Sequence, residues 1–348
     1  MNTSCFLIAG PCAAENERQL YETANQLFEQ SSHFPFPLSF FRVGIWKPRS
    51  NAADFSGAGE AAFPWLKKIN KDFHFPICVE VATPQHVELC QKNGITNVWI
   101  GARTSVNPFA VQELAKSMCG GNFTVLVKNP IIPDLKLWIG NLERIEKIGV
   151  QKLFAIHRGF AENTENVLRN RPMWEIPIAL RVARPDIPIL CDPSHISGNT
   201  QYIKQIAQIS IDYGFDGLMI ETHYQPQSAL SDASQQFTPA ELTQLLSELI
   251  FKEHSNALPN ELLRKPRTLI RNIDTQMGQL LAQRMKLIEE IAEIKQKNNL
   301  PLVQPEQWNQ VVKTYQNAAL KDELYQEFLQ NFLNLLHQYS LQKQQKNQ

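Results

Sequence analysis

The sequence predicts an α/β fold, a closed (β/α)8 barrel of the TIM type, followed by a small all-α domain of three helices. Three observations lead to this prediction. Eight short β-rich runs recur along residues 1–252, with room for one helix between consecutive runs. Eight is the number of strands at which such a parallel barrel closes. Near Phe251 the alternation stops, and long helix-period patterns replace it.

The eight runs are apolar along most of their length, as expected of parallel strands that are covered by protein on both faces. The segments between them carry apolar residues at helical spacing, for example in the stretches that end at Gly94 and Gly214. An open, doubly wound sheet is the alternative arrangement of the same units. The predicted strands are Cys5–Gly10, Ser39–Ile45, Pro76–Val81, Asn97–Gly101, Thr124–Asn129, Leu153–Gly159, Ile187–Pro193 and Gly217–His223.

The C-terminal part of the chain is predicted to be helical. Residues 252–266 are polar and contain two prolines, Pro259 and Pro266, so we expect a linker over residues 253–265. Residues 266–348 are expected to form a thin module whose long first helix would expose apolar surface if it stood alone, so we expect a homodimer. Its three predicted helices cover Arg267–Asn299, Glu306–Ala319 and Lys321 to about Gln344.

The composition excludes some classes of partner. Lysine and arginine number 34, and aspartate and glutamate number 34, so no net charge draws the protein to nucleic acid or to a membrane surface. No apolar run has the length of a membrane span. The six cysteines form no C-x-x-C pair and no disulfide-like framework, which is typical of reduced thiols in a cytoplasmic protein.

Polar and charged side chains follow the predicted strands where each strand ends. In the stretch IPILCDPSHISG, Ile187 to Gly198, an apolar run ends in a carboxylate, a proline, a hydroxyl and an imidazole. A single group of this kind is usually solvated or paired in a salt bridge. All eight strands end this way, and a barrel carries its chemistry at the carboxyl ends of its strands. The pattern therefore predicts one site at the mouth of the barrel.

These side chains fall into two sets. Five cations at one mouth of a neutral protein repel one another unless an anionic ligand is bound, and arginine suits carboxylate and phosphate. The cations are Lys47, Arg49, Arg103, Lys128 and Arg158. A small ligand with several negative charges is therefore expected.

The second set combines a thiol, an imidazole and two carboxylates: Cys12, His195, Glu221 and Asp232. This mixture suits Mn²⁺, Fe²⁺, Co²⁺ or Zn²⁺ better than Mg²⁺ or Ca²⁺. Taken singly, Cys12 could be a small buried apolar residue, and His195 a capping or core histidine.

Short motifs at successive strand ends carry a family resemblance. They are IAGPC, KPRS, IGAR, HRGF, DPSH, and DGLMIETH followed by ALSDASQQ. In this order they resemble the type I 3-deoxy-D-arabino-heptulosonate 7-phosphate (DAHP) synthases of the shikimate pathway, over nearly all of residues 1–250. The resemblance implies a metal-dependent condensation of phosphoenolpyruvate with erythrose 4-phosphate, which releases phosphate.

The resemblance also implies roles for single residues. Lys47 is the candidate proton donor to the forming alkoxide. The metal would be held by Cys12, His195, Glu221 and Asp232; phosphoenolpyruvate by Arg42, Lys47, Arg103, Lys128 and Arg158; and erythrose 4-phosphate by Pro48, Arg49 and Ser50.

Two other reactions compete with this assignment for the barrel. The 3-deoxy-D-manno-octulosonate 8-phosphate (KDO8P) synthases share the barrel and the phosphoenolpyruvate chemistry, but their sugar loop typically reads KANRSS, where this chain has KPRSN. A Schiff-base aldolase that uses Lys47 or Lys128 would leave the metal-binding set unexplained.

In the helical tail, Arg284 and Lys295 lie 11 residues apart, close to three turns, and so share one face of the long helix. Ser340 and Gln344 lie one turn apart on the third helix. Periodicity alone fits equally well a dimerising helical hairpin with cations at its edge.

The pattern RTLIRNIDTQMGQLLAQRM, followed by IAEIK, is similar to the all-helical, AroQ-type chorismate mutases over about Arg267 to Gln345. The resemblance implies conversion of chorismate to prephenate. Arg284, with Arg267 of the other protomer, would bind the two carboxylates. Lys295 and Gln344 would meet the ether oxygen, and Ser340 would line the pocket. Common relatives carry aspartate, arginine and glutamate at the positions of Gln304, Gln307 and Trp308.

Two functions remain open for this tail. It could be a working mutase, or a mutase-like binding module that senses a pathway product. In either case we expect prephenate bound in the tail to inhibit the barrel.

Overall fold

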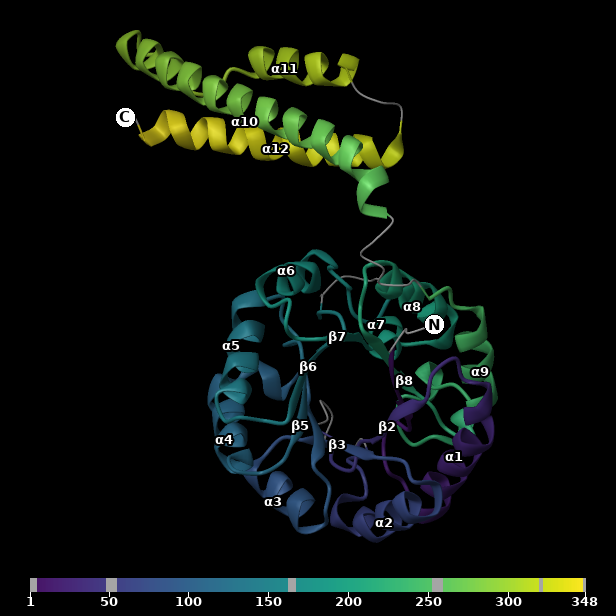
Figure 1. Cartoon of the computed structure of the whole chain (residues 1–348). Coiled ribbons are helices and arrows are strands. Elements are labelled where there is room, and N and C mark those ends of the chain that lie inside the picture. Colours follow the sequence, from purple (N-terminus) through teal and green to yellow (C-terminus); the bar gives the residue numbers. More distant parts are fainter. Residues whose placement is uncertain (1–4, 48–54, 162–166, 252–258, 319–321, 347–348) are drawn as a thin grey trace. The chain divides into compact units, whose positions relative to one another are not determined.

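A computed structural model describes residues 5–47, 55–161, 167–251, 259–318 and 322–346. The chain forms two compact units, Met1–His254 and Ser255–Gln348. The first contains the strands, and the second contains the last three helices (Figure 1). All six cysteines lie in the described part of the first unit and are free thiols.

The first unit is a closed parallel barrel with the strand order β1 to β8 (Figure 1). The last strand pairs with the first, in register from Phe6 opposite Gly217 to Gly10 opposite Glu221. The predicted barrel is confirmed, and the open doubly wound sheet is excluded. The strands are β1 Phe6–Gly10, β2 Leu38–Val43, β3 Ile77–Val81, β4 Asn97–Ile100, β5 Thr124–Lys128, β6 Lys152–His157, β7 Ile189–Cys191 and β8 Gly217–Glu221.

A ring of helices surrounds the strands (Figure 1). Many of them begin at a residue whose side chain accepts a hydrogen bond from the first turn, as Thr238 does in a capping box with Glu241. The barrel helices are α1 Glu17–Gln30, α2 Ala62–Phe73, α3 Pro84–Lys92, α4 Pro108–Met118, α5 Leu135–Glu146, α6 Glu175–Ala183, α7 Pro193–Ser197, α8 Ile203–Asp212 and α9 Pro239–Glu248.

The barrel buries two apolar layers. The larger one fills the space between the strands and the surrounding helices, where Leu20, Leu66 and Trp138 are fully or almost fully buried. The smaller one fills the inside of the barrel, where Trp99 and Met219 are fully buried. Side chains therefore occupy the interior of the barrel, and the polar site is confined to the ends of the strands.

Strand β7 ends earlier than predicted, at Cys191, because Asp192 begins the short helix α7. The Asp192 side chain accepts a hydrogen bond from the backbone N–H of His195, and Pro193 occupies the first helical turn, where its missing N–H is not needed. The short sequence DPSH is therefore a helix start placed directly at the end of a strand.

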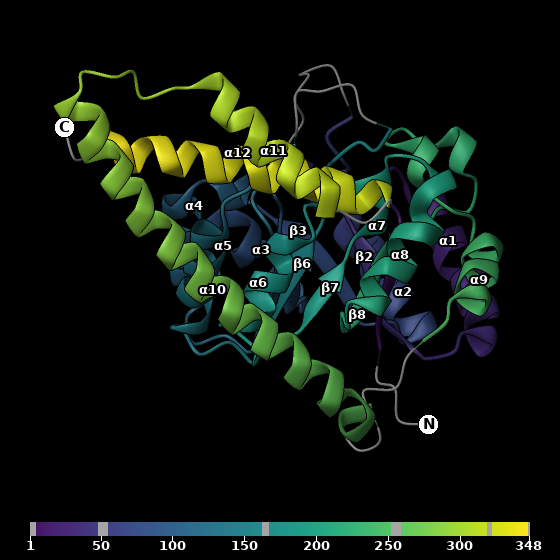
Figure 2. The same cartoon turned by 90° about the horizontal axis from the view of Figure 1, so that it is seen from above.

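The second unit consists of α10 Pro259–Lys297, α11 Pro305–Ala318 and α12 Glu323–Lys346. Helix α10 begins well before Arg267 and contains Pro266. The expected linker is therefore helical from Pro259 onward, since a proline at the first position of a helix costs it no hydrogen bond. Helices α10 and α12 pack together, and Figure 2 shows them close near their C-terminal ends and diverging toward their starts.

Among the described residues, no helix combines the length and the apolar character needed to cross a membrane.

Candidate functional site

A cavity of about 520 Å³ opens at the end of the barrel where the strands finish. Cationic side chains predominate among the charged groups that line it, as the sequence predicts. The charged and titratable lining residues are Lys47, Arg103, Lys128, Arg158 and Arg169, with Glu80, His195 and Asp232. The arrangement favours a small polyanionic ligand.

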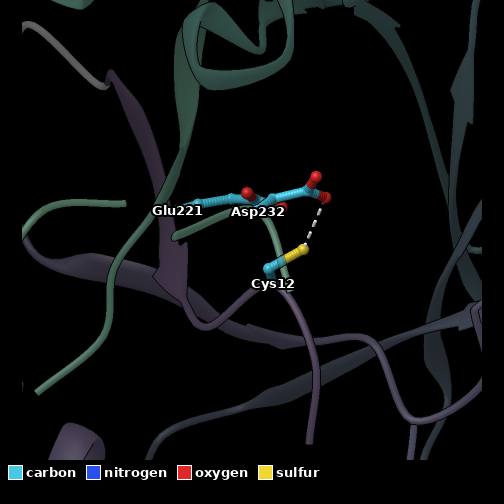
Figure 3. A group of neighbouring side chains, drawn as sticks. All are labelled: Cys12, Glu221 and Asp232. Carbon is cyan, nitrogen blue, oxygen red and sulfur yellow. Dashed lines mark hydrogen bonds between the residues drawn. The ribbon is translucent and has the colours of Figure 1, made fainter. Parts of the chain in front are cut away.

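Three of the four predicted metal-binding residues form one cluster (Figure 3). Cys12 follows β1, Glu221 ends β8, and Asp232 lies in the loop beyond β8. Their ligand atoms all lie within 4.8 Å of one another, and Cys12 Sγ is 3.1 Å from Asp232 Oδ2. Asp232 adopts a left-handed backbone conformation with φ 47°, which aspartate tolerates better than most residues.

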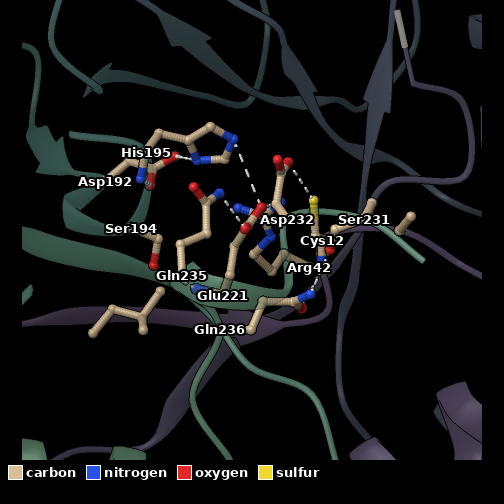
Figure 4. A network of polar contacts seen from close by, with 12 residues as sticks. Cys12, Arg42, Asp192, Ser194, His195, Glu221, Ser231, Asp232, Gln235 and Gln236 are labelled. Carbon is tan, nitrogen blue, oxygen red and sulfur yellow. Dashed lines mark hydrogen bonds and ion pairs between the residues drawn. The ribbon is translucent and has the colours of Figure 1, made fainter. Parts of the chain in front are cut away.

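His195, the fourth predicted ligand, lies at the edge of this cluster and outside the 4.8 Å group (Figure 4). Its Nε2 atom is 3.7 Å from Glu221 Oε1. Its Nδ1 atom is 2.8 Å from Asp192 Oδ2, a carboxylate that therefore orients the imidazole. Burial lowers the pKa of His195 to about 4, so the ring is neutral at pH 7 and Nε2 can act as a ligand.

The carboxylates of the cluster are held ionised. Burial alone would raise the pKa of Glu221, but His195, Arg42 and Lys47 outweigh it, and the pKa falls below its ordinary value. Asp232 behaves in the same way, because Lys47 and other neighbouring cations outweigh burial and lower its pKa. Burial, reinforced by Glu221, raises the pKa of the Cys12 thiol to about 12.

Arg42 lies on β2, and its guanidinium is buried at the base of the site. Its Nη2 atom donates to Glu221 Oε1 at 2.9 Å, and its guanidinium carbon lies 5.1 Å from the centre of the Trp99 ring. The Nε and Nη1 atoms are buried and make no hydrogen bond. Buried donors without a partner are costly, so these two point to an anion that completes the site.

Lys47 connects the cations to the acidic cluster. Its Nζ atom donates to Cys12 Sγ at 2.5 Å and to the Cys12 carbonyl at 3.2 Å, and it lies 3.8 Å from Asp232 Oδ2. Burial alone would lower the pKa of Lys47, but Cys12, Glu221 and Asp232 more than reverse this and raise it. Lys47 is therefore a protonated donor at neutral pH.

The cations at the ends of β5 and β6 are buried, and each has a specific partner. Lys128 Nζ donates to Asp192 Oδ2 at 2.7 Å, and burial lowers the pKa of Lys128. Arg158 Nη1 donates to Asn170 Oδ1 at 2.7 Å, and burial lowers the pKa of Arg158 to about 10. Arg103 is exposed at the cavity edge. Pro48, Arg49 and Ser50 lie outside the described residues.

In the helical unit, four of the five predicted residues come together between α10 and α12. Arg284 Nη1 donates to Ser340 Oγ at 2.8 Å. Lys295 Nζ lies 3.3 Å from Gln344 Oε1 and 2.5 Å from the Leu302 carbonyl. Burial lowers the pKa of Lys295. Arg267 is exposed near the start of α10.

Comparison with known proteins identifies both units. Residues 1–257 match the model of the DAHP synthetase I family, and residues 266–345 match chorismate mutase type II. The chain belongs to the DAHP synthetase I family. With its second domain, it is a bifunctional shikimate-pathway enzyme: a DAHP synthase barrel fused to a chorismate mutase domain.

Of three relatives of this chain, two are DAHP synthases by name, and the third has the name of the octulosonate reaction, which shares the barrel. A phospho-2-dehydro-3-deoxyheptonate aldolase from Thermotoga maritima is 28% identical over 70% of this chain and 68% of its own length. A crystal structure of a Thermotoga maritima DAHP synthase superposes with a TM-score of 0.61 at 26% identity, over 71% of this chain and 68% of that one. A 2-dehydro-3-deoxyphosphooctonate aldolase from Legionella pneumophila is 23% identical over 72% of this chain and 94% of its own length.

The synthase barrel also contains residues that the sequence analysis assigned to no role. Asp192 pairs with Lys128 and His195, although its position at the end of β7 marked it as polar. Arg169 Nη1 donates to Asp232 Oδ1 at 3.0 Å, and no pattern around Arg169 indicated this contact. Gln235 and Gln236 lie inside the quoted motif ALSDASQQ, but only their neighbour Asp232 was given a role.

Proposed function

We propose that a divalent transition metal, bound by Cys12, Glu221, Asp232 and His195, serves the condensation in the barrel. The observation that carries this proposal is the convergence of thiol and carboxylate ligand atoms within 4.8 Å of one another, beside a cation-lined cavity. A soft sulfur beside carboxylates and a neutral imidazole suits Mn²⁺, Fe²⁺, Co²⁺ or Zn²⁺. When bound, such an ion supplies Lewis-acid polarisation of the sugar aldehyde.

The protein's own residues would then bind and orient the two anionic substrates. We assign phosphoenolpyruvate to the buried cations, including Arg42, whose free Nε and Nη1 donors suit a carboxylate or phosphate. Erythrose 4-phosphate is assigned to the segment that begins at Lys47 and continues through Pro48, Arg49 and Ser50. Holding two mutually repelling anions at bonding distance supplies a large proximity effect.

Lys47 is the proposed general acid. The alkene carbon of phosphoenolpyruvate attacks the aldehyde carbon, and Lys47 Nζ gives a proton to the oxygen that becomes an alkoxide. Water then adds at the carbon that bears the phosphate, and phosphate leaves. A lysine whose pKa is raised keeps its proton until the oxygen becomes basic enough to take it.

The sugar is the point at which DAHP synthase and KDO8P synthase differ. Loss of phosphoenolpyruvate should be followed with erythrose 4-phosphate and, separately, with arabinose 5-phosphate. We expect turnover with the four-carbon sugar only. Faster turnover with the five-carbon sugar would assign the barrel to the other reaction.

We further propose which residues carry the mutase reaction of the second domain. Arg284 would bind one chorismate carboxylate, Lys295 and Gln344 would stabilise negative charge on the ether oxygen, and Ser340 would hold Arg284 in place. The hydrogen bonds between α10 and α12 support this assignment, because preorganised donors lower the barrier of a rearrangement that needs no proton transfer.

Chorismate turnover by Arg284→Ala and Lys295→Ala tests this assignment. Lys286→Ala, which removes an exposed cation from the same helix, is the matched control. We expect both test variants to lose at least about 100-fold in kcat/KM, in line with the loss of one preorganised donor. The control should stay near the parent, and turnover that survives both test changes would remove the catalytic role.

A homodimer through the mutase domain is proposed from the exposed face of α10. Leu269, Ile273, Met277 and Leu280 recur at helical spacing and are between 46% and 63% exposed. The same face continues to Arg284, so a second copy that covers the stripe would bring its own Arg267 to the pocket. Leu280→Asp should give monomers in light scattering, while the polar exchange Gln279→Asp should not.

A second candidate role for this domain is the sensing of its own product. Trp308 packs edge-on against His337 with 4.1 Å between ring centroids, at a position where common mutases carry glutamate. We propose that prephenate bound here inhibits the synthase. Synthase activity that does not change at saturating prephenate would exclude this regulation.

A further inference from the structure

Two consecutive buried glutamines lie beside the proposed metal ligands (Figure 4). Gln235 is 0% exposed and Gln236 is 2% exposed, although glutamine side chains are mostly exposed in proteins. They follow Asp232 by three and four residues. The next residue, Phe237, forms a parallel bridge with Thr222 at the end of β8, and this bridge returns the loop to the barrel.

Gln235 joins the two carboxylates of the cluster. Its Nε2 atom donates to Glu221 Oε2 at 2.6 Å. Its Oε1 atom accepts from Arg169 Nη1 at 2.8 Å, and the same Nη1 donates to Asp232 Oδ1 at 3.0 Å. The Gln235 amide therefore bonds to Glu221 directly, and it is linked to Asp232 through the guanidinium of Arg169.

Gln236 joins the third ligand to the same loop. Its Oε1 atom accepts from the backbone N–H of Cys12 at 3.0 Å. Its Nε2 atom donates to the backbone carbonyl of Ser231 at 2.9 Å, one residue before Asp232. The amide therefore links the start of the chain to the loop more than 200 residues later.

Each glutamine accepts a hydrogen bond at Oε1 and donates one from Nε2, and the partners fix the orientation of the amide. A carboxylate and a peptide carbonyl can only accept, and a guanidinium and a peptide N–H can only donate. Each glutamine must therefore turn its NH₂ group one way and its oxygen the other. Neither leucine nor glutamate can provide this combination at the same length, so the amide itself is what the position requires.

We propose that Gln235 and Gln236 are positioning residues that hold Cys12, Glu221 and Asp232 at coordination distance. The proposal rests on the metal site put forward under Proposed function. The three ligands come from the first strand, the last strand and a loop, and the two amides are hydrogen-bonded to all three segments. Partners behind the ligands of a metal site typically contribute 10- to 100-fold to its affinity.

Cobalt(II) titration of the full-length protein tests the proposal, because a thiolate–cobalt bond gives an absorption band of its own. We expect Gln235→Leu and Gln236→Leu to weaken Co²⁺ binding by roughly 10- to 100-fold and to weaken or shift the thiolate band. The KM for phosphoenolpyruvate at saturating Co²⁺ should change less than about twofold. Gln244→Leu, at an exposed glutamine of α9, is the matched control.

Two further measurements separate the possible failures. Cys12→Ser must remove the band; if it does not, the metal site itself is wrong and the positioning role falls with it. Circular dichroism and thermal unfolding of each variant, compared with the parent, report whether its barrel is folded. If a leucine variant does not fold, Gln236→Asn keeps the amide but shortens its reach, and it should weaken Co²⁺ binding in the same direction. Affinity and band that match the parent in folded variants would overturn the proposal.

Discussion

Arg42 and Glu221 form a fully buried ion pair at the base of the synthase site. Taking charges out of water is costly, and removal of one partner leaves the other uncompensated. Pairs of this kind contribute little net stability, but removal of one partner is strongly destabilising. The Arg42–Glu221 pair joins the acidic cluster to the cations that are proposed to hold the substrate.

We predict that Arg42→Met lowers the free energy of unfolding of the barrel by about 3–5 kcal/mol, because the fully buried carboxylate of Glu221 loses its arginine partner. Urea unfolding followed by circular dichroism measures this loss. The matched control is Arg184→Met, since Arg184 pairs with the half-exposed carboxylates of Glu146 and Asp186. It should cost no more than about 1 kcal/mol. Equal losses in the two variants would contradict the prediction.

His157 gives the barrel a dependence on pH. The ring is fully buried near Phe160 and Trp174, and burial, with help from Arg158, lowers its pKa from 6.5 to about 3. Between these values the unfolded chain binds a proton that the folded chain does not, so stability falls as the pH falls. The loss begins near pH 6.5 and grows down to about pH 3.

We predict that the neutral variant His157→Gln reduces this dependence. From pH 7 to pH 5 the parent should lose about 2 kcal/mol more unfolding free energy than the variant. Comparison of the two pH profiles isolates His157, because His195, whose pKa is also lowered, is present in both proteins. Parallel profiles would contradict the prediction, because they would show that His157 does not contribute to the pH dependence of the unfolding free energy.

How far the sequence predicts the site differs from residue to residue. Asp192 and His195 were visible because a polar run ended an apolar strand. Arg169 lies in an irregular segment between β6 and α6 where no period or motif points at the site. Its contact with Asp232 depends on the path of the loop. It also requires glycine at position 198, because a side chain there would collide with Arg169.

At the scale of elements, the close approach of β1 and β2 depends on Gly10. Gly10 has φ +143°, and a Cβ added there would lie 2.2 Å from the Arg42 carbonyl oxygen. Strand β1 can therefore reach β2 only with glycine at its last position, two residues before Cys12.

We predict that Gly10→Ala destabilises the barrel far more than Gly120→Ala. Gly120 also has a positive φ, +77°, but a Cβ there would meet nothing within 4 Å, so its replacement should cost only about 1–2 kcal/mol of backbone strain. Thermal unfolding gives the comparison, and unchanged chorismate turnover would show that the damage is confined to the barrel. Similar melting temperatures for the two variants would refute the steric argument.

The eight strands were predictable because each is a short apolar run bounded by polar residues. Their ends were not, since hydrogen bonding and capping decide them: β7 was predicted to reach Pro193 and stops at Cys191, where Asp192 starts α7. In the tail, proline was taken as a break before Arg267, whereas α10 begins at Pro259 and continues through Pro266.

At the scale of the whole molecule, the two activities should respond separately to loss of metal. The proposed metal ligands all lie in the barrel, and the proposed mutase residues include no metal ligand set. We predict that EDTA abolishes DAHP formation and leaves chorismate turnover within about twofold of the untreated protein. Added Mn²⁺ or Co²⁺ should restore the first activity. Parallel loss of both activities would indicate that the ion supports the whole chain.

The architecture was predictable from the count of units, because eight β-α repeats close into a ring. The assembly of the site was less so. Cys12 and Asp232 are 220 residues apart, and only the pairing of β1 with β8 brings them together. The sequence around either residue therefore gives no local indication that the two side chains meet.

That pairing has a consequence for synthesis on the ribosome. Cys12 emerges first, but the residues proposed to share its metal ion lie on the last strand and beyond it, so a nascent barrel would lack the proposed ion site until residues past Gln236 have left the exit tunnel. Capture of the ion would then signal that the ring has closed, and unfinished chains would stay free of metal.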